Sequence, residues 1–202
     1  QAIGVEVADF TYTQQTHTTN VKRVYARERG QSFPETDGMI TDVPGICLVT
    51  SYADCVPLYF VDPVKKVIGL SHSGWRGTVG KIGKVTVEKM EEEFGCDPAD
   101  ILGAVGPSIC QDCYEVSEDV IKKFRENYDE NLWPEIFYQK ENGKYQLNLW
   151  KANESVFLES GILPEHIAVT NVCTHCNPDI LFSHRTTGNE RGTLSAFLAL
   201  KK

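Results

Sequence analysis

Two apolar runs in the middle of the chain form its clearest structural pattern. Residues 56–61 and 67–70 are each long enough for a buried strand, and the turn-prone segment DPVKK joins them. This pattern predicts an antiparallel hairpin within a sheet. Cys55 immediately precedes the first run and His72 follows the second, so the hairpin would bring a thiol and an imidazole to the same end of the sheet.

Further strands are predicted from apolar and alternating segments elsewhere. They lie at residues 3–12, 21–27, 38–43, 45–52, 101–105, 166–172 and 193–200. The segment FYQKENGKYQLN predicts a second hairpin. Its turn is expected at Asn142 and Gly143, because Asn-Gly favours the left-handed backbone of a tight turn.

Helical signals occur in three segments. Apolar residues recur with a period near 3.6 over residues 78–94, and Gly95 is suited to the C-cap. Residues 118–127 are expected to form a second helix with Ser117 at its N-cap, and residues 148–160 a third. Because strands outnumber helices and most of them are neighbours in sequence, we predict an α+β fold: one domain of mixed β-sheets with flanking helices.

Composition narrows the class of protein. A chain of 202 residues, 41% hydrophobic and 24% charged, fits one compact domain or at most two small ones. The net charge of -8 argues against a nucleic-acid binder, which needs clustered Lys and Arg for phosphate contacts. No apolar run approaches the length of a membrane span, so we expect no membrane partner.

Cysteine usage and the N-terminal segment bear on the compartment. Seven cysteines are an odd number, and their spread does not resemble a small disulfide scaffold. The segment QAIGVEVADF lacks the basic start and apolar core of a signal peptide. Both features favour a reducing, cytoplasmic location.

A third donor joins Cys55 and His72 if the fold allows it. His17 lies in a polar loop between glutamines and threonines, where a lone histidine is usually solvated. Brought to Cys55 and His72, it would complete a Cys/His/His set with one position open. Such a set suits catalytic zinc, and copper is chemically acceptable. Without a metal, Cys55 and His72 would instead be the nucleophile and base of a cysteine hydrolase.

Two loops contain groups suited to anions. Arg76, Gly77 and Thr78 lie between a predicted strand end and a helix start, where backbone N–H groups and a guanidinium form a natural anion pocket. The alternative is that the glycines only turn the chain and Arg76 pairs with a surface carboxylate. The later loop holds a second group of polar residues, which is either an anion-contacting edge or merely polar: His175, His184, Arg185 and Arg191.

Two Cys-x-x-Cys pairs form a rival constellation. Cys110 and Cys113 form one pair, and Cys173 and Cys176 the other. Two such pairs normally indicate a tetrahedral structural zinc. The 59 residues between the pairs exceed the usual gap of a compact zinc ribbon. The sequence therefore favours core packing or incidental clustering of these thiols.

Six motifs together resemble a known family. They are QQTH (14–17), TDGMIT (36–41), YADCVPLYF (52–60), HSGWRGT (72–78), GPSICQDCYEV (106–116) and CTHCNPDILFSHRTTGNERG (173–192). In this order they are similar to the laccase-domain proteins, also called multicopper polyphenol oxidases or purine nucleoside phosphorylases. The resemblance implies a metal site at His17, Cys55 and His72, usually zinc, and a basic residue, Arg76, near substrate or phosphate. It also implies a fold similar to the catalytic domain of cytotoxic necrotizing factor toxins.

The resemblance implies several activities. One is phosphorolysis of purine nucleosides (adenosine, inosine or methylthioadenosine), with adenosine deamination beside it; the others are copper-dependent oxidation of phenols and editing of cell-wall precursors. Five histidines are too few for a full multicopper cluster, so we place the oxidase second. In phosphorolysis Arg76 and the helix start would orient phosphate, and Arg185 would contact it. In deamination Asp54 is the local candidate for proton shuttle.

The N-terminus departs from the family pattern. Family members usually carry further strands before the QxH motif, including a stretch resembling FSTRxGG, whereas this chain starts almost directly at that motif. We therefore expect a laccase-like metal-binding domain over residues 1–202 that is short at its N-terminus. A substrate contact made by such a stretch would be affected.

Overall fold

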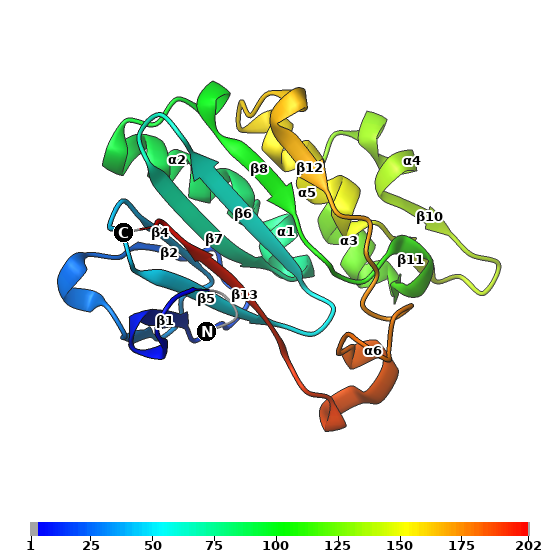
Figure 1. Cartoon of the computed structure of the whole chain (residues 1–202). Coiled ribbons are helices and arrows are strands. Elements are labelled where there is room, and N and C mark those ends of the chain that lie inside the picture. Colours follow the sequence, from blue (N-terminus) through cyan, green and yellow to red (C-terminus); the bar gives the residue numbers. More distant parts are fainter. Residues whose placement is uncertain (1–3, 202) are drawn as a thin grey trace.

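A six-stranded mixed sheet forms the centre of the protein. The computed structural model describes residues 4–201. In spatial order the strands are β12 (Ile167–Val169), β8 (Leu102–Val105), β6 (Val56–Asp62), β7 (Val67–Ser73), β4 (Gly38–Thr41) and β2 (Val21–Arg23). The sheet lies between a layer of helices and a second sheet (Figure 1).

Two smaller sheets complete the β structure. The four-stranded sheet runs in the order β13 (Leu194–Ala199), β5 (Cys47–Tyr52), β1 (Phe10–Thr13) and β3 (Ser32–Phe33). The three-stranded sheet runs in the order β10 (Phe137–Gln139), β11 (Tyr145–Leu147) and β9 (Glu115–Val116). The first packs on one face of the central sheet, and the second lies beside the helices (Figure 1).

Helices cover the other face of the central sheet. The helices on this face are α1 (Trp75–Val79), α2 (Ile82–Phe94) and α5 (Leu149–Glu159). Helices α3 (Glu118–Asn127) and α4 (Trp133–Ile136) pack against them, and α6 (His184–Thr187) lies apart from this layer (Figure 1). Short 3-10 turns occur at Val7–Asp9, Ala26–Glu28, Pro98–Asp100, Gln111–Cys113, Glu130–Leu132, Pro164–His166 and Gly188–Glu190. No helix within residues 4–201 combines the length and apolar character needed to cross a membrane.

The predicted hairpin is confirmed. Strands β6 and β7 pair antiparallel, with Pro57 opposite His72. Asp62 shapes the turn, because its Oδ1 atom accepts the N–H groups of Val64 and Lys65, each at 2.8 Å. Both strands lie in the middle of the central sheet and are covered on both faces, which explains their nearly continuous apolar sequence.

Alternation along the central strands divides the interior into two cores. On β7, Val67 faces the helices, whereas Ile68 and Leu70 face the four-stranded sheet. Gly69 allows helix α2 to approach, since a Cβ there would lie 3.2 Å from the Thr86 methyl group. The hairpin is thus fixed from both sides, and its ends are firm supports for a site.

Several predicted elements are shorter than expected or wrong in part. The strand predicted at 3–12 begins only at Phe10, after a 3-10 turn, and its first residue lies outside the described residues. The strand predicted at 21–27 ends at Arg23. The helix predicted at 78–94 is two helices, because Lys81 adopts a left-handed backbone (φ 56°) and Gly80 lies against Thr19, with no room for a Cβ.

Other elements are confirmed. Helices α3 and α5 and the hairpin with its turn at Gly143 (φ 77°) lie where the sequence places them. Gly95 ends α2 in the left-handed conformation, at φ 64°. Ser117 occupies the N-cap of α3, but its hydroxyl donates to Asp119 and caps no backbone N–H. The fold is α+β with mixed sheets and flanking helices, as predicted.

Candidate metal centre

Three donors from separate segments meet at one end of the central hairpin. The ligand atoms of His17, Cys55 and His72 all lie within 4.8 Å of one another. The Cys55 Sγ atom is 3.9 Å from His17 Nε2, and the two imidazole rings are 5.0 Å apart between centroids. The fold therefore meets the condition that makes His17 a candidate ligand.

Each donor is held by a different kind of local structure. His72 lies on the central strand β7 and is only 4% exposed. Cys55 follows Asp54, whose left-handed backbone (φ 85°) turns the chain into β6. His17 also has a positive φ, 63°, in the loop after β1, and it is the exposed member of the set. Exposure thus rises from His72 through Cys55 to His17.

Asp37 organises this group, and the sequence analysis did not single it out. Its buried carboxylate accepts His72 Nδ1 at 2.9 Å and the backbone N–H groups of Thr16, His17 and Thr18. Because Nδ1 is engaged, His72 Nε2 is the atom left for a ligand or a proton. The only sequence signal for this role was the position of Asp37 within the TDGMIT motif, directly before strand β4.

Electrostatics within the group favour charged forms. Burial alone would raise the pKa of Asp37, but hydrogen bonds from His72 and Thr18 lower it to about 2. Burial would likewise lower the pKa of His72, yet Asp37 and Cys55 raise it to about 9. Against burial, His17 and His72 lower the pKa of the Cys55 thiol to about 6. The site thus stabilises a thiolate between two imidazoles.

Gly74 lets the donors come together. A Cβ at this position would lie 2.8 Å from His17 Cδ2 and 3.0 Å from Cys55 Sγ. Those distances are shorter than van der Waals contact, so any side chain here would push His17 or Cys55 aside. The glycine after His72 is therefore part of the site's geometry.

A cavity of about 310 Å³ opens onto the three donors. Its lining residues are Thr13, Gln15, His17, Ser51, Tyr52, Ala53, Cys55, His72, Arg191 and Thr193. The Tyr52 ring packs 5.4 Å from the His72 ring. Arg191 has a buried Nε atom with no hydrogen-bond partner within residues 4–201. A cationic side chain with unused donor capacity therefore borders the cavity.

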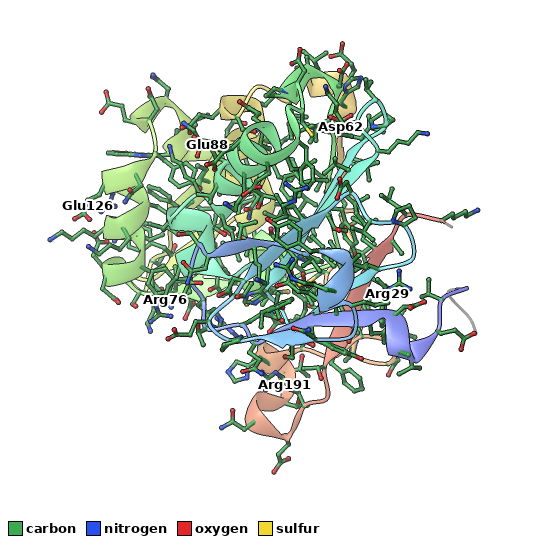
Figure 2. The ribbon with its side chains drawn as sticks, turned by 90° about the vertical axis from the view of Figure 1, so that its left-hand side faces the viewer. Arg29, Asp62, Arg76, Glu88, Glu126 and Arg191 are labelled. Carbon is green, nitrogen blue, oxygen red and sulfur yellow. The ribbon has the colours of Figure 1, made fainter. Side chains whose placement is uncertain are left out.

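The three residues of the first predicted anion site differ in their exposure to solvent. Arg76 is exposed on α1, and its guanidinium lies 4.3 Å from the Trp75 ring. Gly77 is buried. Thr78 is fully buried, its hydroxyl donates to the Gly74 carbonyl at 3.0 Å, and it contacts no solvent. Figure 2 shows Arg76 and Arg191 in the lower half of the same view.

The polar groups of the later loop are largely engaged, partly within the loop and partly with Asp54 and Glu115. Arg185 donates its backbone N–H to Asp54 Oδ2 at 2.7 Å and its Nη2 to the Glu115 carbonyl at 3.0 Å. His175 hydrogen-bonds Thr186, and His184 the Gly188 carbonyl. Asp54 Oδ1 accepts the Thr174 hydroxyl at 2.6 Å. Both carboxylate oxygens of Asp54 are thus engaged by this loop, and Arg191 is the loop cation that lines the cavity.

Comparisons with known proteins identify the family. The family model described as multi-copper polyphenol oxidoreductase laccase matches residues 1–201. The chain belongs to this family. Purine nucleoside phosphorylase YlmD of Bacillus subtilis is 34% identical over 207 residues, covering 98% of this chain and 73% of the relative. Adenosine deaminase RL5, from an unknown prokaryotic organism, is 34% identical over 197 residues, covering 94% of this chain and 74% of the relative.

A solved structure agrees with the laccase-family fold. The crystal structure of YlmD from Geobacillus stearothermophilus superposes with a TM-score of 0.95 at 32% identity, covering 100% of this chain and 77% of that one. The predicted fold class and the predicted family are therefore confirmed.

The donor set fits a metal of the kind that this family implies. A thiolate and two imidazoles are the ligands that zinc takes in catalytic sites, and copper accepts them too. The Asp37 carboxylate accepts from His72 Nδ1, and metal-bound histidines are usually oriented by a carboxylate or carbonyl in this way. Exposure on the His17 side leaves space for one further ligand.

The two Cys-x-x-Cys pairs also come together. The sulfur atoms of Cys110, Cys113, Cys173 and Cys176 lie within 4.8 Å of one another. Cys173 belongs to the hydrophobic core and the half-buried Cys110 and Cys113 pack against it, whereas Cys176 is exposed. The expected core packing thus holds for three of the four thiols, and the structure adds that all four sulfur atoms meet.

Proposed function

We propose that this protein is a zinc-dependent purine nucleoside phosphorylase whose zinc is bound by His17, Cys55 and His72. The observation that carries the proposal is the meeting of these three donors at a cavity that is open to solvent. The names of the relatives support the reaction: YlmD is called a purine nucleoside phosphorylase, as is the Bacteroides thetaiotaomicron relative, 34% identical over 197 residues.

The side chains around the donors would prepare the site. Asp37 accepts from His72 Nδ1 and so keeps His72 Nε2 directed at Cys55 and His17. Gly74 keeps the space between the donors free. Bound zinc would supply Lewis-acid character and a bound water of lowered pKa.

Phosphate would be held by arginine. Arg191 lines the cavity with an unpartnered Nε atom, and Arg76 follows His72 at the start of α1. A phosphate oxygen would form a bond to ribose C1′ while the bond from C1′ to the purine nitrogen breaks and its electron pair leaves with the purine. The arginines would act by orientation and by charge stabilisation in the transition state. Arg185 and Gly77 are weaker candidates for phosphate contact, because Arg185 Nη2 already donates to the Glu115 carbonyl and Gly77 is buried.

The test is a purine-release assay on zinc-loaded protein, with adenosine as substrate and with or without phosphate. The expected product is adenine, formed only with phosphate, together with ribose 1-phosphate. Metal-free protein, His17→Ala and His72→Ala should each be inactive. Full activity in protein shown by elemental analysis to lack metal would overturn the proposal.

Deamination of adenosine is a second candidate, favoured by the likeness to a relative named adenosine deaminase. The same assay measures it as inosine and ammonia. Asp54 does not suit the predicted proton shuttle, because Thr174 and Arg185 occupy both oxygens of its carboxylate. Deamination here would therefore need another proton carrier, and Asp54→Asn should alter the two activities in parallel by changing structure alone.

A metal-free cysteine hydrolase is favoured by the closeness of Cys55 to two imidazoles, with its Sγ atom 3.9 Å from His17 Nε2. The pKa of Cys55 falls to about 6 beside two imidazoles, which would make it a reactive thiolate near neutral pH. Iodoacetamide should label Cys55 in metal-free protein, and bound zinc should protect it. Labelling that proceeds equally in the zinc-loaded, active protein would favour the hydrolase. Copper in the purified protein, with phenol oxidation and no purine release, would favour the oxidase that the family description names.

A further inference from the structure

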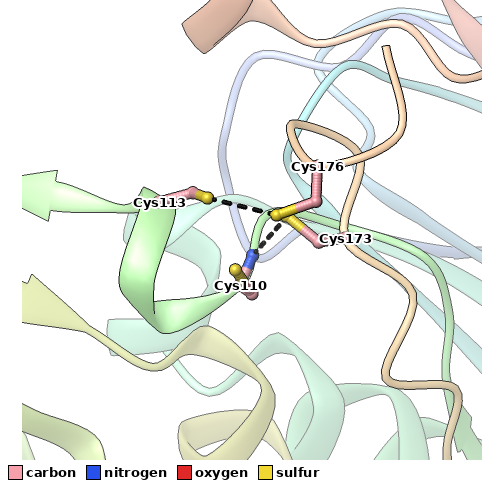
Figure 3. A group of neighbouring side chains, drawn as sticks. All are labelled: Cys110, Cys113, Cys173 and Cys176. Carbon is pink, nitrogen blue, oxygen red and sulfur yellow. Dashed lines mark hydrogen bonds between the residues drawn. The ribbon is translucent and has the colours of Figure 1, made fainter. Parts of the chain in front are cut away.

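We propose that Cys110, Cys113, Cys173 and Cys176 bind a second zinc ion, which is structural and ties two distant segments together beside the candidate metal centre. The four sulfur atoms lie within 4.8 Å of one another, and Cys113 Sγ is 3.5 Å from Cys176 Sγ. Figure 3 shows the side chains converging from two chain segments. Zinc–sulfur bonds of about 2.3 Å in a tetrahedron place the sulfurs about 3.8 Å apart, so small shifts would complete the site.

The backbone holds the two pairs together by itself. Ser108 and Cys173 form an isolated parallel bridge, with Ser108 N–H donating to the Val172 carbonyl at 3.1 Å and Thr174 N–H to the Ser108 carbonyl at 3.2 Å. The Cys110 N–H donates to Cys173 Sγ at 3.3 Å, a bond that favours the thiolate form. The donors are thus positioned by main-chain contacts between segments that are far apart in sequence.

The donor chemistry is that of a closed site. Four cysteines provide four thiolates and leave no position for water or substrate, which is the arrangement of structural zinc. A disulfide would require sulfurs about 2.05 Å apart, well below the 3.5 Å between Cys113 Sγ and Cys176 Sγ. Cys173, Cys110 and Cys113 also pack in or against the hydrophobic core, but Cys176 is exposed, so apolar packing does not account for its place in the cluster.

Both segments of this cluster also form hydrogen bonds to Asp54, the residue immediately before Cys55. The Ile109 N–H, next to Cys110, donates to the Asp54 carbonyl at 3.1 Å. The Thr174 hydroxyl, next to Cys173, donates to Asp54 Oδ1 at 2.6 Å. Asp54 has a strained backbone at φ 85°, which such contacts must hold. The second zinc would therefore stabilise the position of Cys55 without touching the cavity.

The test counts zinc by native mass spectrometry and elemental analysis on the full chain, purified with reductant and supplied with zinc alone. Wild-type protein should carry two zinc ions, and Cys55→Ala one. The double variant Cys113→Ser with Cys176→Ser should also carry one. Cys96→Ala is the matched control, a buried thiol elsewhere that should leave both ions in place.

Cobalt gives a readout that needs neither activity nor a stable double variant. Cys55→Ala protein loaded with cobalt should still show the thiolate charge-transfer bands of a tetrahedral four-sulfur site, and chelation should lower its melting temperature. A single zinc in wild type that Cys55→Ala removes would overturn the proposal. A Cys113–Cys176 disulfide persisting in reduced protein would overturn it as well. Because metal counting is independent of turnover, these results also separate this proposal from the phosphorylase proposal.

Discussion

The two donor clusters of this protein differ in how they meet solvent. His17, Cys55 and His72 border a cavity, and their exposure rises from a buried strand residue to an exposed loop residue. The four cysteines instead converge between two segments that are joined by a backbone bridge, and only Cys176 among them is exposed. The first cluster has three donors and leaves one coordination position of a tetrahedral metal open. The second has four donors and leaves no position open.

The two clusters are also held in place by different parts of the fold. The three-donor centre rests on a strand of the central sheet and on the buried Asp37. The four-cysteine cluster rests on main-chain contacts around Ser108. The comparison teaches that the same thiol chemistry can serve reaction or stability according to the number of donors and their access to water. The predictions below test that division.

The largest effect is expected from Cys55→Ala. Loss of one of only three ligands should abolish zinc binding at the cavity and reduce phosphorolysis to background, while the fold persists. Activity and elemental analysis provide the measurement, with circular dichroism as the check on folding. Cys176→Ser should leave measurable activity and lower the melting temperature instead. Equal loss of activity in both variants with no change of stability in either would contradict the division.

Gly74→Ala should disturb the three-donor centre by steric overlap, without removing a ligand atom. The added methyl group would lie 2.8 Å from the His17 ring and 3.0 Å from Cys55 Sγ, so at least one of these donors must move. Zinc at the cavity should be lost or weakly held, and the four-cysteine zinc retained. Gly77→Ala, whose Cβ would meet only ordinary contacts at 3.5 Å, is the control for metal content.

Asp37→Asn should weaken zinc binding at the three-donor centre without removing a ligand. Loss of the carboxylate behind His72 is expected to lower zinc affinity by about 10–100-fold. Competition with a zinc chelator measures it. The four-cysteine site shares no contact with Asp37 and should keep its affinity; a fall at both sites would show that the substitution disturbs the whole fold.

Arg191→Met and Arg185→Met compare two cations of one loop. Arg191 lines the cavity, whereas the Arg185 guanidinium is bonded to the Glu115 carbonyl. Loss of a charge-assisted hydrogen bond should raise the KM for phosphate by about tenfold in Arg191→Met. Steady-state kinetics with varied phosphate should show a smaller effect for Arg185→Met. A larger effect for Arg185→Met than for Arg191→Met would instead indicate that phosphate binds near Arg185, on the side of the four cysteines.

A pH-dependent effect is expected in the acid stability of metal-free protein. Asp37 has its pKa lowered from 3.8 to about 2, so it adds stability above about pH 4 that is lost as the pH falls towards 2. The contribution is about 2 kcal/mol. Denaturant unfolding of wild type and Asp37→Asn at several pH values should show their difference shrinking over that window. A constant difference would contradict the assignment.

Much of the candidate site follows from local pattern. The apolar runs predicted the hairpin, and the hairpin placed Cys55 and His72 at one end of the sheet. Asp37 was missed because its role depends on contacts with His72 and with the loop at Thr18, neither of which is near in sequence. The break at Lys81 was missed because the apolar periodicity runs on across it, while Lys81 adopts a left-handed backbone and Gly80 packs against Thr19 of a distant loop.

By itself the sequence determined the strands, the main helices, the mixed α+β class and the family, since periodicity, turn residues and motifs are local properties of the chain. Only the tertiary structure decided which donors meet. It joined His17 to Cys55 and His72, turned Asp54 away from the cavity, and brought two cysteine pairs together across 59 residues. These outcomes depend on sheet pairing and loop closure, whose energies are shared among many distant residues and are encoded in no single segment.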